Sequence, residues 1–377
     1  MRILVLLTDA FGGHGGIAKF NRDLIAALCS YPRCEEVVAI PRMAPLPIGS
    51  LPPKLTQRSD CLNGRWRYAT ALGKTLLGRG GFDLVLCGHI NLLPLAAAAG
   101  ALVHAPHALI LHGIEAWAPT PRRLSNRLAG RMGSFIAVSD VTKERFLKWT
   151  SLPAERGFIL PNCVELSQFA PGPKSEALLD RYGLRGKTIL MTFGRLDSRE
   201  RAKGFDEVLE CLPSLANEIP NIAYLIAGDG KDRGRLETKA SELKVRERVV
   251  FAGRISEAEK AEHYRLADAY VMPSRGEGFG IVYLEALACG IPTVGSSTDG
   301  SREALRHGEL GILVNPSNAR EICEGIRKAL AQPKGIPPGL DYFSHVNFEK
   351  RVHEWLDCRL EAVDPSVESP GNRELRP

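Results

Sequence analysis

The chain has 377 residues, of which 44% are hydrophobic, and it carries a formal net charge of +6. This length predicts two domains, and no run reaches the roughly 20 apolar residues that a membrane span needs. The nine cysteines are scattered without a CxxC pair. This spacing argues against a disulfide framework or a zinc site and favours reduced thiols in a cytosol.

The first element is a short apolar stretch, Ile3–Leu7, which predicts a buried strand because it is too short for the core of a signal peptide. A glycine-rich loop at 11–17 follows, and then a predicted helix over Ala18–Cys29. Gly15 and Gly16 suit the close approach of a diphosphate to a helix N-terminus. A nicotinamide site is the weaker alternative because the match to GxGxxG is imperfect, and the absence of GxxxxGK[ST] excludes a P-loop ATPase.

The positive charge is concentrated in residues 1–170, with 19 Lys and Arg against 11 Asp and Glu. Within the segment 54–79, six basic residues face the single acid Asp60, with apolar side chains such as Trp66 and Leu77 among them. Two interpretations stay open: a basic amphipathic helix on an anionic membrane surface, or a solvated helix face. No recognised nucleic-acid motif accompanies this charge, so nucleic acid is not an expected partner.

Short apolar strands alternate with helical stretches along the whole chain, which predicts an α/β fold with parallel sheets. A linker at Gln168–Lys174 divides the chain into predicted domains at 1–168 and 174–342, each doubly wound. A last helix is predicted over Phe343–Glu361, with an apolar stripe that includes Val346, and residues 362–377 are expected to be disordered. The predicted strands are Ile3–Leu7, Val37–Ile40, Leu84–Cys87, Leu109–Leu111, Phe135–Val138, Ile189–Phe193, Ala223–Ala227, Val249–Phe251, Ala269–Met272, Thr293–Gly295 and Ile312–Val314.

Candidate site residues follow several of these strands, where ligands bind in doubly wound folds. His112 follows the strand Leu109–Leu111, although a purely structural role fits this histidine equally well. Arg195 lies in a glycine turn after the strand Ile189–Phe193, and Lys203 precedes a helix that begins near Gly204. Two cations at the carboxyl end of a strand suit a diphosphate leaving group.

The segment 277–285 (EGFGIVYLE) places two carboxylates eight residues apart across a glycine turn and part of a helix predicted over Ile281–Ala288. A strand, a glycine turn and a helix leave free backbone N–H groups that attract phosphate. Glu277, in the turn, is placed for sugar hydroxyls, and Glu285, about two helical turns deeper, for a ribose diol. The alternative is a structural glycine turn with two surface glutamates.

Together these segments resemble glycosyltransferase family 4, the retaining, sugar-nucleotide-dependent transferases of the GT-B fold. The resemblance spans nearly the whole chain. Its marks are the glycine loop at 12–16, AVSD at 137–140, PN at 161–162 with Phe169, GR at 194–195 with KG at 203–204, AGDG at 227–230 and E-x7-E at 277–285. It implies two Rossmann-like domains, with the acceptor in the first, the donor in the second and the C-terminal helix returning to the first.

The resemblance also implies a role for each matching residue. Arg195 and Lys203 would neutralise the donor diphosphate, Glu277 would hold the transferred sugar and Glu285 the ribose. His112 would lie beside the reacting carbon, and Arg254 falls in the segment that contacts the base. Backbone amides at Gly278, Phe279 and Gly280 would contact sugar or phosphate, and Gly15 and Gly16 would close over the diphosphate.

The resemblance implies transfer of a hexose from a UDP- or GDP-sugar to a glycan precursor, with a lipid-linked oligosaccharide as the expected acceptor. No DxD motif is present, so no catalytic metal is expected. The sugar nucleotide is expected as the donor substrate, and no cofactor is expected beside it. The expected location is the cytoplasm, at the inner face of the membrane if the 54–79 segment binds it. Two alternatives stay open: a soluble sugar or polyol acceptor, and a non-catalytic sugar-nucleotide-binding protein.

Overall fold

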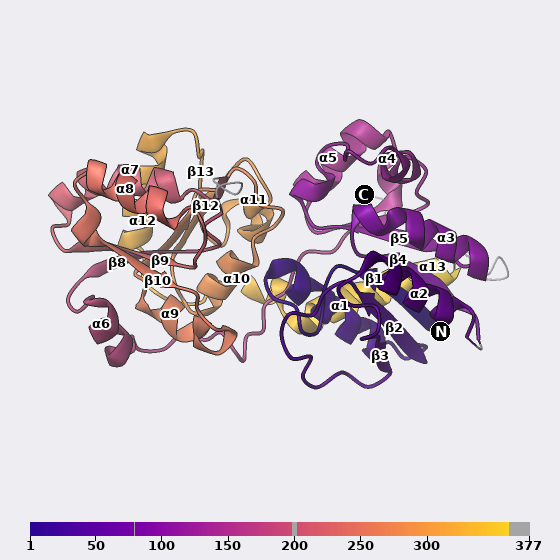
Figure 1. Cartoon of the computed structure of the whole chain (residues 1–377). Coiled ribbons are helices and arrows are strands. Elements are labelled where there is room, and N and C mark those ends of the chain that lie inside the picture. Colours follow the sequence, from indigo (N-terminus) through magenta and orange to yellow (C-terminus); the bar gives the residue numbers. More distant parts are fainter. Residues whose placement is uncertain (79, 198–201, 362–377) are drawn as a thin grey trace, which may run out of the picture.

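The computed structural model describes residues 1–78, 80–197 and 202–361, and it contains two parallel β-sheets that lie side by side (Figure 1). The predicted disorder of residues 362–377 concerns residues outside this description. The first sheet has the strand order β3-β2-β1-β4-β5-β6-β7. Its strands are β1 (Arg2–Leu7), β2 (Glu36–Pro41), β3 (Leu55–Gln57), β4 (Leu84–Cys87), β5 (His107–Leu111), β6 (Phe135–Ala137) and β7 (Gly157–Ile159).

The second sheet has the order β10-β9-β8-β11-β12-β13, also with parallel pairing throughout. In both sheets the order reverses next to the first strand of the unit, which is the topology of doubly wound folds that bind ligands at the carboxyl ends of their strands. The strands are β8 (Thr188–Phe193), β9 (Ile222–Ala227), β10 (Val249–Gly253), β11 (Ala269–Met272), β12 (Thr293–Ser296) and β13 (Ile312–Val314).

Helices cover both faces of each sheet because the strands are apolar on both sides. In β1, for example, Ile3 and Val5 belong to one buried cluster, whereas Leu4 and Leu6 belong to another. The helices are α1 (Gly16–Ser30), α2 (Arg65–Leu76), α3 (Leu93–Val103), α4 (Arg123–Ala129), α5 (Asp140–Thr150), α6 (Glu176–Tyr182), α7 (Phe205–Glu218), α8 (Arg233–Glu242), α9 (Lys260–Leu266), α10 (Ile281–Ala288), α11 (Ser301–Ala304), α12 (Ala319–Ala331) and α13 (His345–Glu361).

The last helix, α13, leaves the second unit and packs along α1 of the first (Figure 1). Phe348 meets Phe20 edge-on with ring centroids 5.8 Å apart, and the Tyr31 hydroxyl donates to the Asp357 carboxylate at 2.5 Å. Val346, which the sequence pattern places in the apolar stripe, is instead 75% exposed. The predicted fold class is confirmed: two doubly wound α/β units with a C-terminal helix that returns to the first.

Two strands, β3 and β7, are absent from the prediction because each has three residues and lies at an edge of the first sheet, where the apolar signal is weak. The prediction of one basic helix over 54–79 is wrong for its first part, which forms β3 and a loop before α2 begins at Arg65. Among the described residues, no helix is both long enough and apolar enough to span a membrane.

Candidate active site

The glycine loop between β11 and α10 reaches across to the first unit. The Ser139 hydroxyl, at the start of α5, donates to the carbonyl oxygen of Gly278 at 2.6 Å. A Cβ atom on Gly278 would lie 2.0 Å from the carbonyl oxygen of His112 and 2.9 Å from the Cα of Gly113. The carboxyl ends of β5 and β11 therefore meet backbone to backbone, and only a glycine permits this approach.

His112 stands at this junction, directly after β5. Its Nε2 lies 3.1 Å from the carbonyl oxygen of Gly88, and its ring meets that of Phe20 edge-on at 5.2 Å. Because a carbonyl oxygen only accepts, Nε2 carries the proton and Nδ1 remains a hydrogen-bond acceptor. Burial lowers the pKa of His112 to about 4, so the imidazole is neutral at pH 7.

Lys203 and Glu277 form an ion pair at the same edge of the second sheet. The Lys203 ammonium lies 2.5 Å from Oε2 of Glu277, and the two side chains are 22% and 17% exposed. Lys203 precedes Gly204, which is the N-cap residue of α7 and has a φ of +86°. A Cβ atom on Gly204 would lie 2.7 Å from the carbonyl oxygen of Pro273. Arg195 follows β8 at this edge and is exposed. The structure thus brings two residues of the predicted donor site together, although 74 positions separate them in the chain.

Glu285 occupies a different environment from the one the sequence suggests. Its side chain on α10 has no exposed surface. Oε2 accepts a hydrogen bond from the Tyr264 hydroxyl at 2.8 Å, and Oε1 lies 3.4 Å from the Lys260 ammonium. Both partners come from α9, and no motif pointed to either of them. Glu285 as a ribose-binding residue therefore stays a prediction, with Lys260 beside the carboxylate.

The remaining predicted residues are spread over the carboxyl ends of the two sheets. Gly15 and Gly16 are exposed at the start of α1, and a Cβ on either would meet nothing within 4 Å. Phe279 is 2% exposed and packs on Phe343 with ring centroids 5.6 Å apart, so only its backbone could face a donor. Gly280 caps α10 with a φ of +92°. Arg254 is exposed after the edge strand β10, with β9 and β8 between it and β11.

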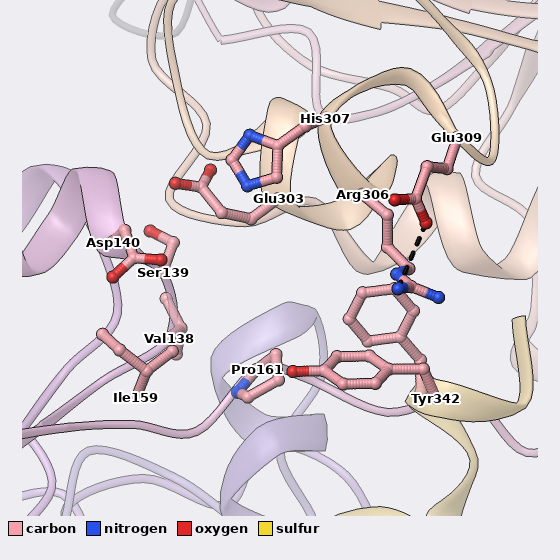
Figure 2. A pocket seen from close by; sticks show the side chains of 11 residues that line it. Val138, Ser139, Asp140, Ile159, Pro161, Glu303, Arg306, His307, Glu309 and Tyr342 are labelled. Carbon is pink, nitrogen blue, oxygen red and sulfur yellow. Dashed lines mark ion pairs between the residues drawn. The ribbon is translucent and has the colours of Figure 1, made fainter. Parts of the chain in front are cut away.

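A cavity of about 210 Å³ lies between the two units on the side of α5 (Figure 2). Figure 2 shows the Glu303 carboxylate pointing from α11 towards Ser139 and Asp140. Oε1 of Glu303 accepts the backbone N–H of Val141 at 3.1 Å, and Arg306 pairs with Glu309 at 3.1 Å on the opposite wall. This contact connects Glu303 of the second unit to the first turn of α5 in the first unit.

The described residues hold no group of three or more His, Cys, Asp or Glu side chains arranged to bind a metal ion. The described part of the site offers paired charges and backbone amides. One cation, Lys203, is directly opposed to a carboxylate, and glycine loops from both units expose backbone at the junction. This arrangement suits a polar, negatively charged ligand with hydroxyl groups.

Two family models match consecutive parts of the chain. Glycosyltransferase Family 4 matches residues 14–168, and Glycosyl transferases group 1 matches residues 178–337. Among solved structures, HepE of Anabaena in complex with UDP and glucose superposes with a TM-score of 0.72 at 19% identity. That comparison covers 95% of this chain and all of the other, and it shows the shared fold.

Two curated relatives are mycobacterial mannosyltransferases. The GDP-mannose-dependent alpha-(1-6)-phosphatidylinositol monomannoside mannosyltransferase of Mycolicibacterium smegmatis is 34% identical over 253 residues. The match covers 64% of this chain and spans 64% of that relative's length, slightly less than two thirds. The phosphatidyl-myo-inositol mannosyltransferase of Mycobacterium tuberculosis is 34% identical over 249 residues, 64% of this chain and 61% of the relative. With both family models matched in order and the GT-B fold in place, the chain belongs to glycosyltransferase family 4.

Proposed function

We propose that this protein is a retaining glycosyltransferase that transfers a hexose from a sugar nucleotide to a lipid-linked glycan acceptor. The observation that carries the proposal is the Lys203–Glu277 pair, because Glu277 lies in the glycine loop that approaches the backbone of His112 in the opposite unit. A donor diphosphate beside Lys203 and a sugar beside Glu277 would place the reacting carbon at the junction of the two units. Membership of family 4 supports the same reaction.

In the proposed reaction, the bond between the anomeric carbon and the diphosphate oxygen breaks. A new bond to the acceptor hydroxyl forms on the same face, and the acceptor proton moves to the leaving phosphate oxygen. The diphosphate gains negative charge as this happens, and preorganised cations stabilise that charge. Lys203 and Arg195 would supply positive charge without a divalent metal, and the exposed amides at Gly15 and Gly16 would face the diphosphate from the first unit.

The neutral state of His112 suits a position beside the reacting carbon. An imidazolium there would repel the positive charge that the sugar ring develops, whereas a neutral ring only places a dipole against it. Glu277 would accept hydrogen bonds from the sugar hydroxyls once the diphosphate draws Lys203 away. Glu285 would reach a ribose only after Lys260 moves, because its carboxylate has no exposed surface in this structure.

The donor is expected to be a GDP-hexose, since the M. smegmatis relative is described as GDP-mannose-dependent. Adding GDP or GDP-mannose at a hundredfold excess over its Kd should therefore raise the free energy of unfolding by about 2.7 kcal/mol. Differential scanning fluorimetry against GDP, UDP, ADP and their hexose conjugates measures this shift. In Glu285→Gln the nucleotide should no longer raise the melting temperature above that of the same variant without ligand.

A surface substitution, Glu218→Gln, serves as the control because Glu218 is the last residue of α7, at the opposite end of this helix from Lys203, and its side chain is partly exposed. A shift with UDP-sugars alone would reassign the donor base while keeping the proposed reaction. No shift with any nucleotide, together with no transfer of radiolabelled hexose, would contradict the proposed function.

The acceptor is proposed to be lipid-linked because the helix α2 presents a surface suited to an anionic membrane. Trp66 and Leu77 are 86% and 85% exposed, and Arg65, Arg67 and Lys74 are exposed around them. An indole ring beside basic side chains is typical of protein segments at the membrane interface. The buried side of the helix, which includes Tyr68 and Leu72, packs on the first sheet instead.

Vesicle flotation tests this surface. Each basic residue near an anionic leaflet contributes about 1 kcal/mol, so Arg65→Glu/Arg67→Glu/Lys74→Glu should weaken binding to phosphatidylglycerol vesicles at least roughly 100-fold. The triple variant Lys187→Glu/Lys244→Glu/Lys328→Glu changes the net charge equally at exposed positions of the second unit and should bind like the wild type. Equal flotation of both triple variants, or equal binding of the wild type to zwitterionic vesicles, would argue against membrane binding by α2.

A further inference from the structure

We propose that Asp299 is a positioning residue that holds the backbone of Glu277 in place for catalysis; this inference rests on the proposed function. Asp299 lies between β12 and α11 and has no exposed surface. Its Oδ2 accepts the backbone N–H of Glu277 at 2.8 Å. The next residue, Gly300, donates its own N–H to the carbonyl oxygen of Glu277 at 2.9 Å. Both backbone polar groups of Glu277 are therefore held by one neighbouring loop.

The Asp299 carboxylate uses its full acceptor capacity within this loop pair. Besides Glu277 N–H, Oδ2 accepts from the Ser274 hydroxyl at 2.7 Å. Oδ1 accepts from the N–H and the hydroxyl of Ser301 at 3.1 Å and 2.6 Å. A carboxylate has about four acceptor positions, and all four are used here. The buried Asp299 carboxylate thus connects the loop after β11 to the first residue of α11 by hydrogen bonds.

The orientation of the Glu277 side chain depends on this support. Glu277 belongs to a loop that has glycines at 276, 278 and 280, and glycines give the backbone more freedom than other residues. Its carboxylate nevertheless meets the Lys203 ammonium at 2.5 Å. A site on a loop requires a second layer of hydrogen bonds to reach the accuracy that catalysis needs. Asp299 supplies that layer for the loop.

The hydrogen bonds that Asp299 accepts depend on its charge state and therefore on pH. Burial, with a smaller contribution from the nearby Glu277 carboxylate, raises the pKa of Asp299 to about 6. The titratable side chains that face it are Glu277, from the glycine loop, and Tyr283, from α10. Asp299 is mostly ionised at pH 7.5 and takes up a proton as the pH falls through 6. The protonated carboxyl must donate from one oxygen, so it no longer accepts all four hydrogen bonds.

The direct test is Asp299→Asn, which keeps the shape but replaces one accepting oxygen by an NH₂ group that faces a donor. The expected result is a fall in kcat of about 100-fold, the effect of a misplacement of roughly 1 Å, with little change in KM for the acceptor. The kcat of the wild type should also decrease below pH 6, and the variant should lack this transition. Amide hydrogen exchange at Glu277 should become faster in the variant.

Asp268→Asn is the matched control. Asp268 accepts the backbone N–H of Ile189 at 2.8 Å and pairs with Lys174 and Lys334, but it lies at the amino ends of β8 and β11, away from the glycine loop. It should change stability and leave the pH profile of kcat unaltered. If Asp299→Asn fails to fold, Ser274→Ala is the milder variant and should give faster exchange at Glu277 with a smaller loss of kcat.

Failure of the positioning role and failure of the proposed function give different results. Unchanged exchange at Glu277 and a wild-type kcat in Asp299→Asn would overturn the positioning role while leaving the transferase intact. A wild-type protein that transfers no hexose from any donor would overturn the proposed function, whereas faster exchange at Glu277 would still establish the contact made by Asp299.

Discussion

Replacing Lys203 with alanine should lower kcat for hexose transfer at least about 100-fold, the effect of removing one preorganised charge from a developing anion. The ammonium of Lys203 is largely shielded from solvent and lies 2.5 Å from Glu277, so its charge is little screened. Its loss would also leave Glu277 without this partner, and that carboxylate would then oppose the donor diphosphate. Steady-state kinetics with a GDP-hexose donor measures the effect.

Two variants make this test specific. Lys203→Arg keeps the charge but replaces a compact ammonium with a planar fork, so it should recover part of the lost rate. Lys239→Ala removes a lysine of α8 that has the same 22% exposure and pairs with Asp206 and Glu210 of α7, and it should leave kcat close to normal. Near-normal turnover by Lys203→Ala would contradict the role assigned to this residue.

Replacing Gly278 with alanine should also reduce kcat about 100-fold or more, because the two units could no longer approach each other as they do here. The added Cβ would lie 2.0 Å from the carbonyl oxygen of His112. Its three nearest atoms all belong to His112 and Gly113 of the first unit, and none is a flexible side-chain end. Because these atoms belong to the backbone, we expect the strain to be relieved by a shift of the two units away from each other at this junction.

The measurements for Gly278→Ala are turnover, small-angle scattering and nucleotide-induced stabilisation. We expect a larger radius of gyration and a melting temperature close to that of the wild type. Gly234→Ala is the matched control, because a Cβ on this glycine of α8 would meet nothing within 4 Å. Alanine favours a helix by up to about 1 kcal/mol over glycine, so this control should be as stable as the wild type or more so. An active Gly278→Ala with an unchanged radius would show that the close contact is not needed for catalysis.

The fold was largely predictable because parallel strands buried on both faces are continuously apolar and stand out in the sequence. The helix at 281–288 has the predicted bounds, since glycines mark both of its ends. The strands β3 and β7 escaped detection because edge strands of three residues, with part of their surface exposed, carry little apolar signal. The family was recognisable from motifs that each combine a strand end with a turn.

The candidate site was predictable only in part. The sequence pointed to Lys203, Glu277 and His112 because each follows the end of a strand or begins a helix, and local rules locate such positions. Their mutual contacts were not predictable, since the Lys203–Glu277 pair and the approach of Gly278 to His112 join distant segments. The roles of all the predicted site residues stay predictions, as do the proposed domain limits at 168 and 174.

The family, the two doubly wound units and the strand ends where a ligand would bind were all predictable from the amino-acid sequence, because they depend on apolar patterning and on glycine positions that follow local rules. Which charged side chains contact each other depends on how the chain folds. The fold buries Glu285 against Tyr264 and Lys260, and it sets Asp299 behind Glu277. The sequence shows that a residue carries a carboxylate, but it does not show whether that carboxylate is buried or which groups contact it. Its environment is created by side chains from other elements, and burial and hydrogen bonding by those side chains decide what it can do.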